Sequence, residues 1–244
     1  MNFELKAPAT QYGLVTLSYW AFTLSDGALR MLVLLFFHNL GYSPIEIASL
    51  FLLYEFFGVV TNLYGGWLGS RFGLTLTMQL GLGLQIFALA LLLADPSVLT
   101  VVYVMIAQAI SGIAKDLNKM AAKSSIKTLV ADGEQGKLYR WVAMLTGSKN
   151  ALKGMGYFLG GALLATVGLQ GSIAALLSLL LVALVMGIWL LEYQPGSNKG
   201  SFSQSLSPSA GVNRLSAARL FLFCARDVWF VVALPVFLQS QLGW

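Results

Sequence analysis

The chain has 244 residues, of which 57% are hydrophobic and only 10% are charged, and its mean hydropathy is +0.76. So few charges cannot cover the surface of a soluble protein of this length, and the composition predicts an all-α polytopic membrane protein. The net charge of +5 comes from bases at predicted loop edges and inside predicted spans. The sequence predicts no basic surface domain, which argues against a nucleic-acid-binding protein.

Runs of about 20 apolar residues are long enough to cross a bilayer as helices. The sequence contains seven such runs, at about 12–40, 44–69, 74–94, 98–122, 138–167, 171–192 and 215–240. Turn-forming residues separate them, among them Gly41-Tyr42-Ser43-Pro44, Asp95-Pro96 and Gly168-Leu169-Gln170-Gly171. Ser43 before Pro44 and Glu46 predicts a helix start, so we expect a tight hairpin between the first two spans.

Lysines and arginines gather at the span ends that share one side of the membrane if the helices alternate, and the three opposite loops contain none. These bases are Lys6, Arg71, Lys123, Lys127, Lys137, Arg140, Lys199 and Arg214. The positive-inside rule therefore predicts a cytoplasmic N-terminus. Residues 194–213, rich in Ser, Gly and Pro, predict a flexible cytoplasmic linker between a six-span bundle at 1–193 and the first span of a second bundle at 214–244.

The beginning of the chain is echoed near its end. Phe22 and Asp26, followed by Leu40-Gly41-Tyr42, correspond to Phe223 and Asp227, followed by Leu242-Gly243-Trp244. Six helices, a linker and a seventh helix similar to the first resemble the layout of the major facilitator superfamily, whose halves are parallel repeats of six spans.

Two short motifs agree with this resemblance. Residues 66–73, Gly-Trp-Leu-Gly-Ser-Arg-Phe-Gly, resemble the conserved loop motif of the superfamily, but Ser70 stands where an aspartate is usual, which weakens a gating charge contact there. Residues 156–161, Gly-Tyr-Phe-Leu-Gly-Gly, resemble its antiporter motif with Tyr157 in place of the usual proline. Close helix packing through the small residues is the alternative interpretation of this second motif.

Charged residues inside the predicted spans mark a working site, because each costs roughly 2.5 to 3.5 kcal/mol at the centre of a membrane helix. They are Asp26, Arg30, Glu55, Lys115, Asp116, Lys119, Lys149, Lys153, Arg226 and Asp227. Residues four apart share a helix face, as do Asp26 with Arg30, Lys115 with Lys119, and Lys149 with Lys153.

Lys149 and Lys153 lie near the middle of a span that contains no acid to neutralise them. Either an acid on another helix or an anionic substrate in a wet cavity must do so. Lysine and arginine are natural partners of phosphate-like oxyanions, while a salt-bridge network that only holds the bundle together is the alternative. The predicted anion-binding residues are Arg30, Lys115, Lys149, Asn150, Lys153 and Arg226, and the predicted coupling or charge-pair residues are Asp26, Glu55, Asp116 and Asp227.

The single cysteine, Cys224, excludes an internal disulfide and a CxxC metal or redox site, and the single histidine, His38, leaves little for a metal centre. No Ser/His/Asp arrangement is visible either, so we expect neither an enzyme nor a bound cofactor. Soft thiol-seeking cargo would favour several sulfur ligands, whereas a cationic interior with one thiol suits a hard oxyanion.

Three stretches, Tyr19 to Met31, Ser111 to Lys127 and Leu138 to Gly154, resemble the ArsJ family of organoarsenical efflux permeases within the major facilitator superfamily. The resemblance implies export of 1-arseno-3-phosphoglycerate, which a partner glyceraldehyde-3-phosphate dehydrogenase makes from arsenate and which releases arsenate outside the cell. It also implies location in the inner membrane of a bacterium. Members of that family have twelve spans, so five are absent here and we expect this chain to be part of a longer protein.

The expected mechanism is alternating access, driven by proton exchange or by the membrane potential. Two alternatives remain open: an exporter of another phosphorylated organic anion, and a membrane sensor or assembly subunit that does not transport.

Overall fold

The computed structural model describes residues 7–131, 133–196 and 209–227, and these residues form helices and connecting loops without strands. The helices are α2 (Pro8–Asn39), α3 (Pro44–Ser49), α4 (Leu52–Phe72), α5 (Leu74–Leu91), the 3₁₀ helix η1 (Pro96–Val98), α6 (Val101–Leu129), α7 (Gln135–Leu190) and α8 (Ala210–Asp227). The chain divides into two compact units, Met1–Lys199 and Gly200–Trp244. The all-α fold predicted from the composition is confirmed.

Local sequence chemistry explains where the first helices begin and end. Pro8 opens α2, at a position where its missing N–H costs nothing. The loop after α2 turns at Gly41, whose φ of +87° favours glycine. Ser43 then caps α3 in a capping box, in which its hydroxyl accepts from the Glu46 N–H and its own N–H donates to the Glu46 carboxylate at 2.8 Å. The predicted hairpin between the first two spans is therefore present.

The second predicted span, at 44–69, is interrupted. It consists of α3 and α4, and the chain between them makes two tight bonds, from the Leu50 N–H to the Ile47 carbonyl and from the Phe51 N–H to the Ala48 carbonyl. Bonds to the third preceding residue replace the α-helical pattern there. Neither Gly nor Pro marks this break, so it could not be predicted from the residues.

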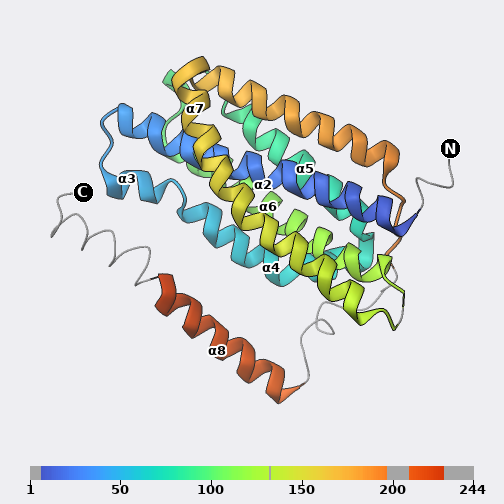
Figure 1. The fold of residues 1–244 in the computed structure, drawn as a ribbon. Coiled ribbons are helices and arrows are strands. Elements are labelled where there is room, and N and C mark those ends of the chain that lie inside the picture. Colours follow the sequence, from blue (N-terminus) through green and yellow to red (C-terminus); the bar gives the residue numbers. More distant parts are fainter. Residues whose placement is uncertain (1–6, 132, 197–208, 228–244) are drawn as a thin grey trace. The chain divides into compact units, whose positions relative to one another are not determined.

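The predicted fifth and sixth spans are the two arms of α7, which folds back on itself at Gly168 (Figure 1). Gly168 has φ +69°, a left-handed conformation that side chains disfavour. The turn predicted at Gly168-Leu169-Gln170-Gly171 is thus the point where the helix reverses.

Within the first unit, α2 packs against α7, and α6 packs against both α4 and α5 (Figure 1). Glycines on α7 allow its first arm to approach α2 closely, because a Cβ built on Gly156 would lie 2.6 Å from the Leu24 carbonyl oxygen. Buried side chains such as Leu29, Leu82 and Leu176 fill the core between α2, α5 and the second arm of α7.

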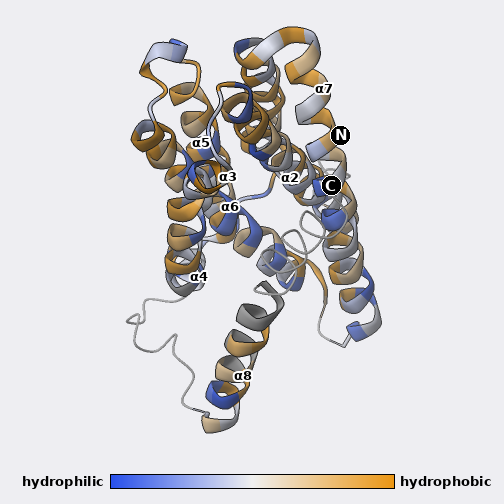
Figure 2. Cartoon of the chain, turned by 90° about the vertical axis from the view of Figure 1, so that its left-hand side faces the viewer, coloured by the Kyte–Doolittle hydropathy of each residue, from blue (hydrophilic) through white to orange (hydrophobic). Residues whose placement is uncertain are grey.

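Many large apolar side chains are exposed, including Val102, Phe158 and Trp189. Figure 2 shows that hydrophobic residues predominate along the helices of the first unit. Four described helical stretches are long and apolar enough to cross a membrane: Pro8–Asn39, Ile45–Asn62, Leu74–Leu91 and Gln135–Leu190. α6 is not among them, and it carries the charged residues Lys115, Asp116 and Lys119. A bundle that is apolar outside and charged along an inner helix is typical of a polytopic membrane protein.

The segment that follows α7 crosses the end of the bundle where α5 begins. Thr75 donates its hydroxyl proton to the Glu192 carbonyl (2.9 Å) and accepts from the Gln194 N–H (3.1 Å). Thr128 donates to the Gln194 side chain at 3.0 Å. Gly73 lies directly under this segment with φ +95°, and a Cβ there would collide with the Gln194 carbonyl.

The second unit contains α8, which corresponds to the start of the predicted seventh span at 215–240. The remainder of that span and the repeated Leu242-Gly243-Trp244 lie outside the described residues. The domain boundaries predicted at 193 and 214 stay predictions.

Candidate functional site

Charged side chains from α2, α4 and α6 meet inside the first unit in one network. Its members are Asp26 and Arg30 on α2, Glu55 on α4, and Lys115, Asp116 and Lys119 on α6. Three helices that are distant in sequence thus bring together six of the ten charged residues of the predicted spans, five of which are predicted site residues.

Tyr54 lies at the centre of this network. The side chain is fully buried, and its hydroxyl donates a hydrogen bond to Asp26 Oδ1 at 2.6 Å. Two cations contact its ring: the Arg30 guanidinium carbon lies 4.1 Å from the ring centroid and Lys115 Nζ lies 4.0 Å from it. Cations over an aromatic ring are attracted by its quadrupole, so Tyr54 holds both bases near the Asp26 carboxylate.

Glu55, the next residue on α4, bridges the same two bases. Its Oε1 lies 2.5 Å from Arg30 Nη2, and its Oε2 lies 3.5 Å from Lys115 Nζ. The Glu55 side chain is 60% exposed, whereas those of Arg30 and Lys115 are 21% and 23% exposed. An accessible acid therefore spans two bases that are largely fixed in the bundle.

Asp116 forms the buried end of the network. It is paired with Lys119 at 2.6 Å and with Lys115 at 3.8 Å, and only 3% of its side chain is exposed. Lys119 also donates to Asn62 Oδ1 at 3.4 Å. Asn62 and Glu55 are both on α4, so that helix contacts α6 through a polar side chain at each of these positions.

Two glycines make room for this arrangement. A Cβ on Gly58 would lie 2.7 Å from Asp116 Oδ2 and 3.5 Å from Lys115 Nζ. A Cβ on Gly112 would overlap the backbone of Tyr54. The missing side chains let α4 and α6 approach closely enough for their charged groups to meet.

The two lysines on the first arm of α7 are half-buried and lie close to this network. Lys149 lies within electrostatic range of four other bases, Lys119, Lys153, Lys123 and Lys115. Lys153 Nζ lies 5.7 Å from the ring of Tyr157. Neither lysine makes an ion pair in the part of the chain that the structure describes. The sequence left two partners open for these lysines, an acid on another helix or an anionic substrate. Among the described residues, no such acid pairs with them.

Close approach of two helices places these lysines beside the network. A Cβ on Gly27 of α2 would lie 2.8 Å from the backbone carbonyl of Lys153. Gly27 is one turn before Arg30, so the α7 lysines and the α2 arginine are held at the same level of the bundle. Asn150, the remaining predicted residue on this arm, is exposed.

Together, these groups comprise five bases and three acids, an excess of two positive charges. The bases are Arg30, Lys115, Lys119, Lys149 and Lys153, and the acids are Asp26, Glu55 and Asp116. A half-buried cluster with surplus positive charge favours an anionic ligand.

The structure also differs from the sequence-based expectations in its pairings. Arg30 pairs with Glu55 on α4, and Asp26, on the same helix face as Arg30, accepts instead from Tyr54. Sequence reasoning missed Tyr54, because a tyrosine in an apolar span is ordinary; its position next to Glu55 was the available signal. Arg226 and Asp227 are the last residues of α8, and their side chains lie outside the described part.

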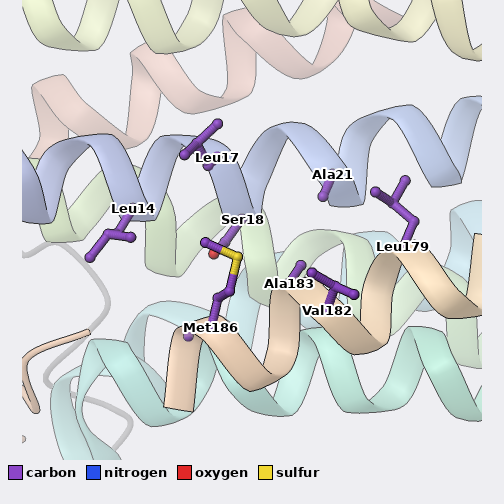
Figure 3. A pocket seen from close by; sticks show the side chains of 9 residues that line it. Leu14, Leu17, Ser18, Ala21, Leu179, Val182, Ala183 and Met186 are labelled. Atoms are coloured by element: carbon purple, nitrogen blue, oxygen red, sulfur yellow. The ribbon is translucent and has the colours of Figure 1, made fainter. Parts of the chain in front are cut away.

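An apolar pocket lies elsewhere, between α2 and the second arm of α7 (Figure 3). It has a volume of about 170 Å³ and is lined by Leu14, Leu17, Ser18, Ala21, Leu179, Val182, Ala183, Met186 and Gly187. Ser18 is the only lining residue with a polar side chain. Such a lining cannot neutralise a charged ligand, so the charged network is the stronger candidate site.

Among the described residues, no group of three or more His, Cys, Asp or Glu side chains could hold a metal ion. The six network residues comprise three bases and three acids, and the two α7 lysines beside them add positive charge, which repels a cation.

The family model described as Major Facilitator Superfamily matches residues 15–244. The chain belongs to the Major Facilitator Superfamily. This agrees with the resemblance found in the sequence, and it makes the protein a multi-pass membrane protein of a transporter family. A comparison with curated proteins gave no match.

Solved structures of peptide transporters share the fold. A bacterial homologue of the human drug peptide transporters PepT1 and PepT2 aligns over 97% of this chain and 56% of its own length, with 17% identity and a TM-score of 0.63. The peptide transporter POT in complex with sulfate aligns over 96% of this chain and 47% of its own, with 15% identity and a TM-score of 0.60. PepTSo aligns over 89% and 48%, with 16% identity and a TM-score of 0.62. The chain thus spans about half the length of these transporters, and identities this low show the fold alone.

Proposed function

We propose that this chain forms one half of a transporter that exports an organoarsenical oxyanion, 1-arseno-3-phosphoglycerate, from the cytoplasm and so gives resistance to arsenate. One observation carries the proposal: five bases and three acids meet on half-buried faces of α2, α4, α6 and α7. An uncompensated base within a membrane is costly, and a polyanionic cargo would supply the missing negative charge.

The chemistry of the cargo fits the arrangement of the bases. The molecule has an arsenate group at one end and a phosphate group at the other. Arg30 and Lys115 form one pair of bases, and Lys149 and Lys153 form a second pair on a different helix. Arginine can bind an oxyanion through a planar fork, while lysine contributes a point charge. In this proposal each pair binds one anionic group.

The proposed mechanism is alternating access. Substrate sites of this superfamily lie near the bilayer midplane between the two halves, so the missing partners would come from the second half, including Arg226 and Asp227. The cargo would be supplied by a glyceraldehyde-3-phosphate dehydrogenase that uses arsenate in place of phosphate. We place the protein in the inner membrane of a bacterium with its N-terminus in the cytoplasm, where proton exchange or the membrane potential would drive efflux.

The specific cargo rests on the resemblance of three stretches, 19–31, 111–127 and 138–154, to the ArsJ family. The bases alone support any small organic anion, so an exporter of another phosphorylated compound is the second candidate. A sensor or assembly subunit is a third, which a stable protein partner and no transport would favour. Membership of a transporter superfamily supports transport over catalysis in each case.

Substitution of the α7 lysines tests the proposal. Lys149→Gln and Lys153→Gln should each abolish arsenate resistance in an arsenate-sensitive bacterial host without changing the amount of protein in the membrane. Lys137→Gln is the matched control on the same helix, because Lys137 pairs with Glu134 at 2.9 Å outside the network. Full resistance in both site variants would contradict the proposal.

A further inference from the structure

We propose that Glu55 is a built-in anion that occupies the position of the cargo's anionic group when the site is empty, so that cargo binds by displacing the Glu55 carboxylate from Arg30 and Lys115. This inference rests on the proposed function of the network as an anion site. It adds a competitor that belongs to the protein itself.

The geometry of the bridge is that of a bound oxyanion. Each Glu55 oxygen contacts a different base, Oε1 with Arg30 Nη2 at 2.5 Å and Oε2 with Lys115 Nζ at 3.5 Å. A phosphate, arsenate or carboxylate group presents pairs of oxygens in a similar way. The same two nitrogens cannot hold Glu55 and an external anion fully at once, so the two must compete.

Both bases are held by groups other than Glu55. Arg30 lies against the rings of Tyr54 (4.1 Å) and Phe51 (5.7 Å). Lys115 lies 4.0 Å from the Tyr54 ring and 3.8 Å from Asp116 Oδ2. Tyr54 is in turn fixed by its hydrogen bond to Asp26. Departure of the Glu55 carboxylate would therefore leave the two bases in place to receive an anion.

Glu55 differs in this respect from the other acids of the network. Asp26 and Asp116 are buried, and Asp116 is tightly paired with Lys119 at 2.6 Å. An acid in such a position cannot leave without stranding a buried charge. Glu55 is 60% exposed, and its long side chain can swing aside at the first turn of α4. Only Glu55, among the described acids of the network, combines two contacts with bases and free access to solvent.

This arrangement has a consequence for selectivity. In the empty site the single charge of the Glu55 carboxylate offsets part of the charge of two bases that would otherwise be more costly in the membrane. A neutral solute cannot replace it, whereas a group with two negative charges can displace one carboxylate and gain attraction. The site would thus prefer dianionic groups such as phosphate or arsenate to a single carboxylate.

Binding of 3-phosphoglycerate to the full chain in lipid nanodiscs tests the inference. Removing the competitor in Glu55→Gln should tighten binding about threefold to tenfold, in line with the strength of exposed and charge-assisted ion pairs. Glu55→Asp keeps the charge but is one methylene shorter and cannot span both bases. The affinity of this variant should therefore lie between that of the wild type and that of Glu55→Gln. Glu46→Gln is the matched control on α3, because the Glu46 carboxylate bonds to Ser43 outside the network, and this variant should bind the ligand as the wild type does.

The outcomes separate this inference from the proposed function. Tighter binding by Glu55→Gln together with weaker binding by Arg30→Gln supports both. If Arg30→Gln weakens binding but Glu55→Gln leaves it unchanged or also weakens it, the proposal that Glu55 competes with the cargo is wrong, while the anion site is supported. No binding by the wild type or by Glu55→Gln, or equal binding by all variants including Arg30→Gln, overturns both.

Discussion

Gly156→Ala tests whether the close contact of α7 with α2 positions the site. A Cβ at this position would lie 2.6 Å from the Leu24 carbonyl oxygen and 3.1 Å from both the Gly27 Cα and the Ala28 nitrogen. These are backbone atoms, which cannot rotate out of the way. Ordinary contact begins at about 3.4 Å, so the two helices must separate by roughly 0.8 Å.

The expected cost follows from two opposing terms. Overpacking of this kind costs about 1 to 3 kcal/mol. Alanine is favoured over glycine within a helix by about 1 kcal/mol, which offsets part of that cost. We therefore expect Gly156→Ala to lower the free energy of unfolding by up to about 2 kcal/mol relative to the wild type. The same displacement moves Lys153 away from Arg30, so anion binding should weaken as well.

Thermal unfolding in detergent, followed by tryptophan fluorescence, measures the effect, which should lower the apparent Tm by up to roughly 8 °C. Gly154→Ala is the matched control two residues away on the same helix, since a Cβ there meets nothing within 4 Å. The control should be as stable as the wild type or more so. If Gly156→Ala unfolds at the same temperature as Gly154→Ala, the packing argument is wrong.

Three further substitutions probe the network and the segment that crosses the bundle end. Tyr54→Phe removes the hydrogen bond to the buried Asp26 carboxylate and should cost about 1.5 to 3 kcal/mol of stability, measured by thermal unfolding. Gly58→Ala forces a methyl group against the buried Asp116 carboxylate and should cost about 1 kcal/mol or more in the same assay. Thr75→Val removes both bonds to the segment after α7 and should cost about 1 kcal/mol per bond, with faster proteolysis of that segment.

Each of these predictions has a control that changes the same group elsewhere. Tyr157→Phe keeps the ring near Lys153, Gly83→Ala adds a methyl group where nothing lies within 4 Å, and Thr166→Val removes a hydroxyl that bonds only within its own helix. A site variant that matches its control in stability would contradict the corresponding prediction.

Local chemistry made part of the fold predictable. The capping box at Ser43 and the reversal at Gly168 both depend on residues adjacent in sequence, and both are where the sequence placed them. The break between α3 and α4 was missed, because neither Gly nor Pro marks Leu50 or Phe51. The fourth predicted span, 98–122, continues as α6 to Leu129, since neither Gly nor Pro follows the apolar run before Gly133.

Spacing along one helix could not predict the pairing between helices. It placed Asp26 and Arg30 on one face, but it contained no information on which α4 residue would oppose them. The partner of Arg30 is Glu55, and Tyr54 separates Asp26 from this bridge. Register between α2, α4 and α6 depends on small residues such as Gly112, whose importance is visible only once the neighbouring backbone is known.

Uptake into everted membrane vesicles that contain the full protein tests the central claim most directly. Arsenate alone is compared with arsenate plus glyceraldehyde-3-phosphate, its dehydrogenase and NAD. Accumulation of arsenic only with the complete mixture, and its loss in Lys153→Gln, is the result that the account predicts. Equal accumulation in both conditions would indicate a plain oxyanion exporter, and no accumulation in either would contradict the proposed cargo.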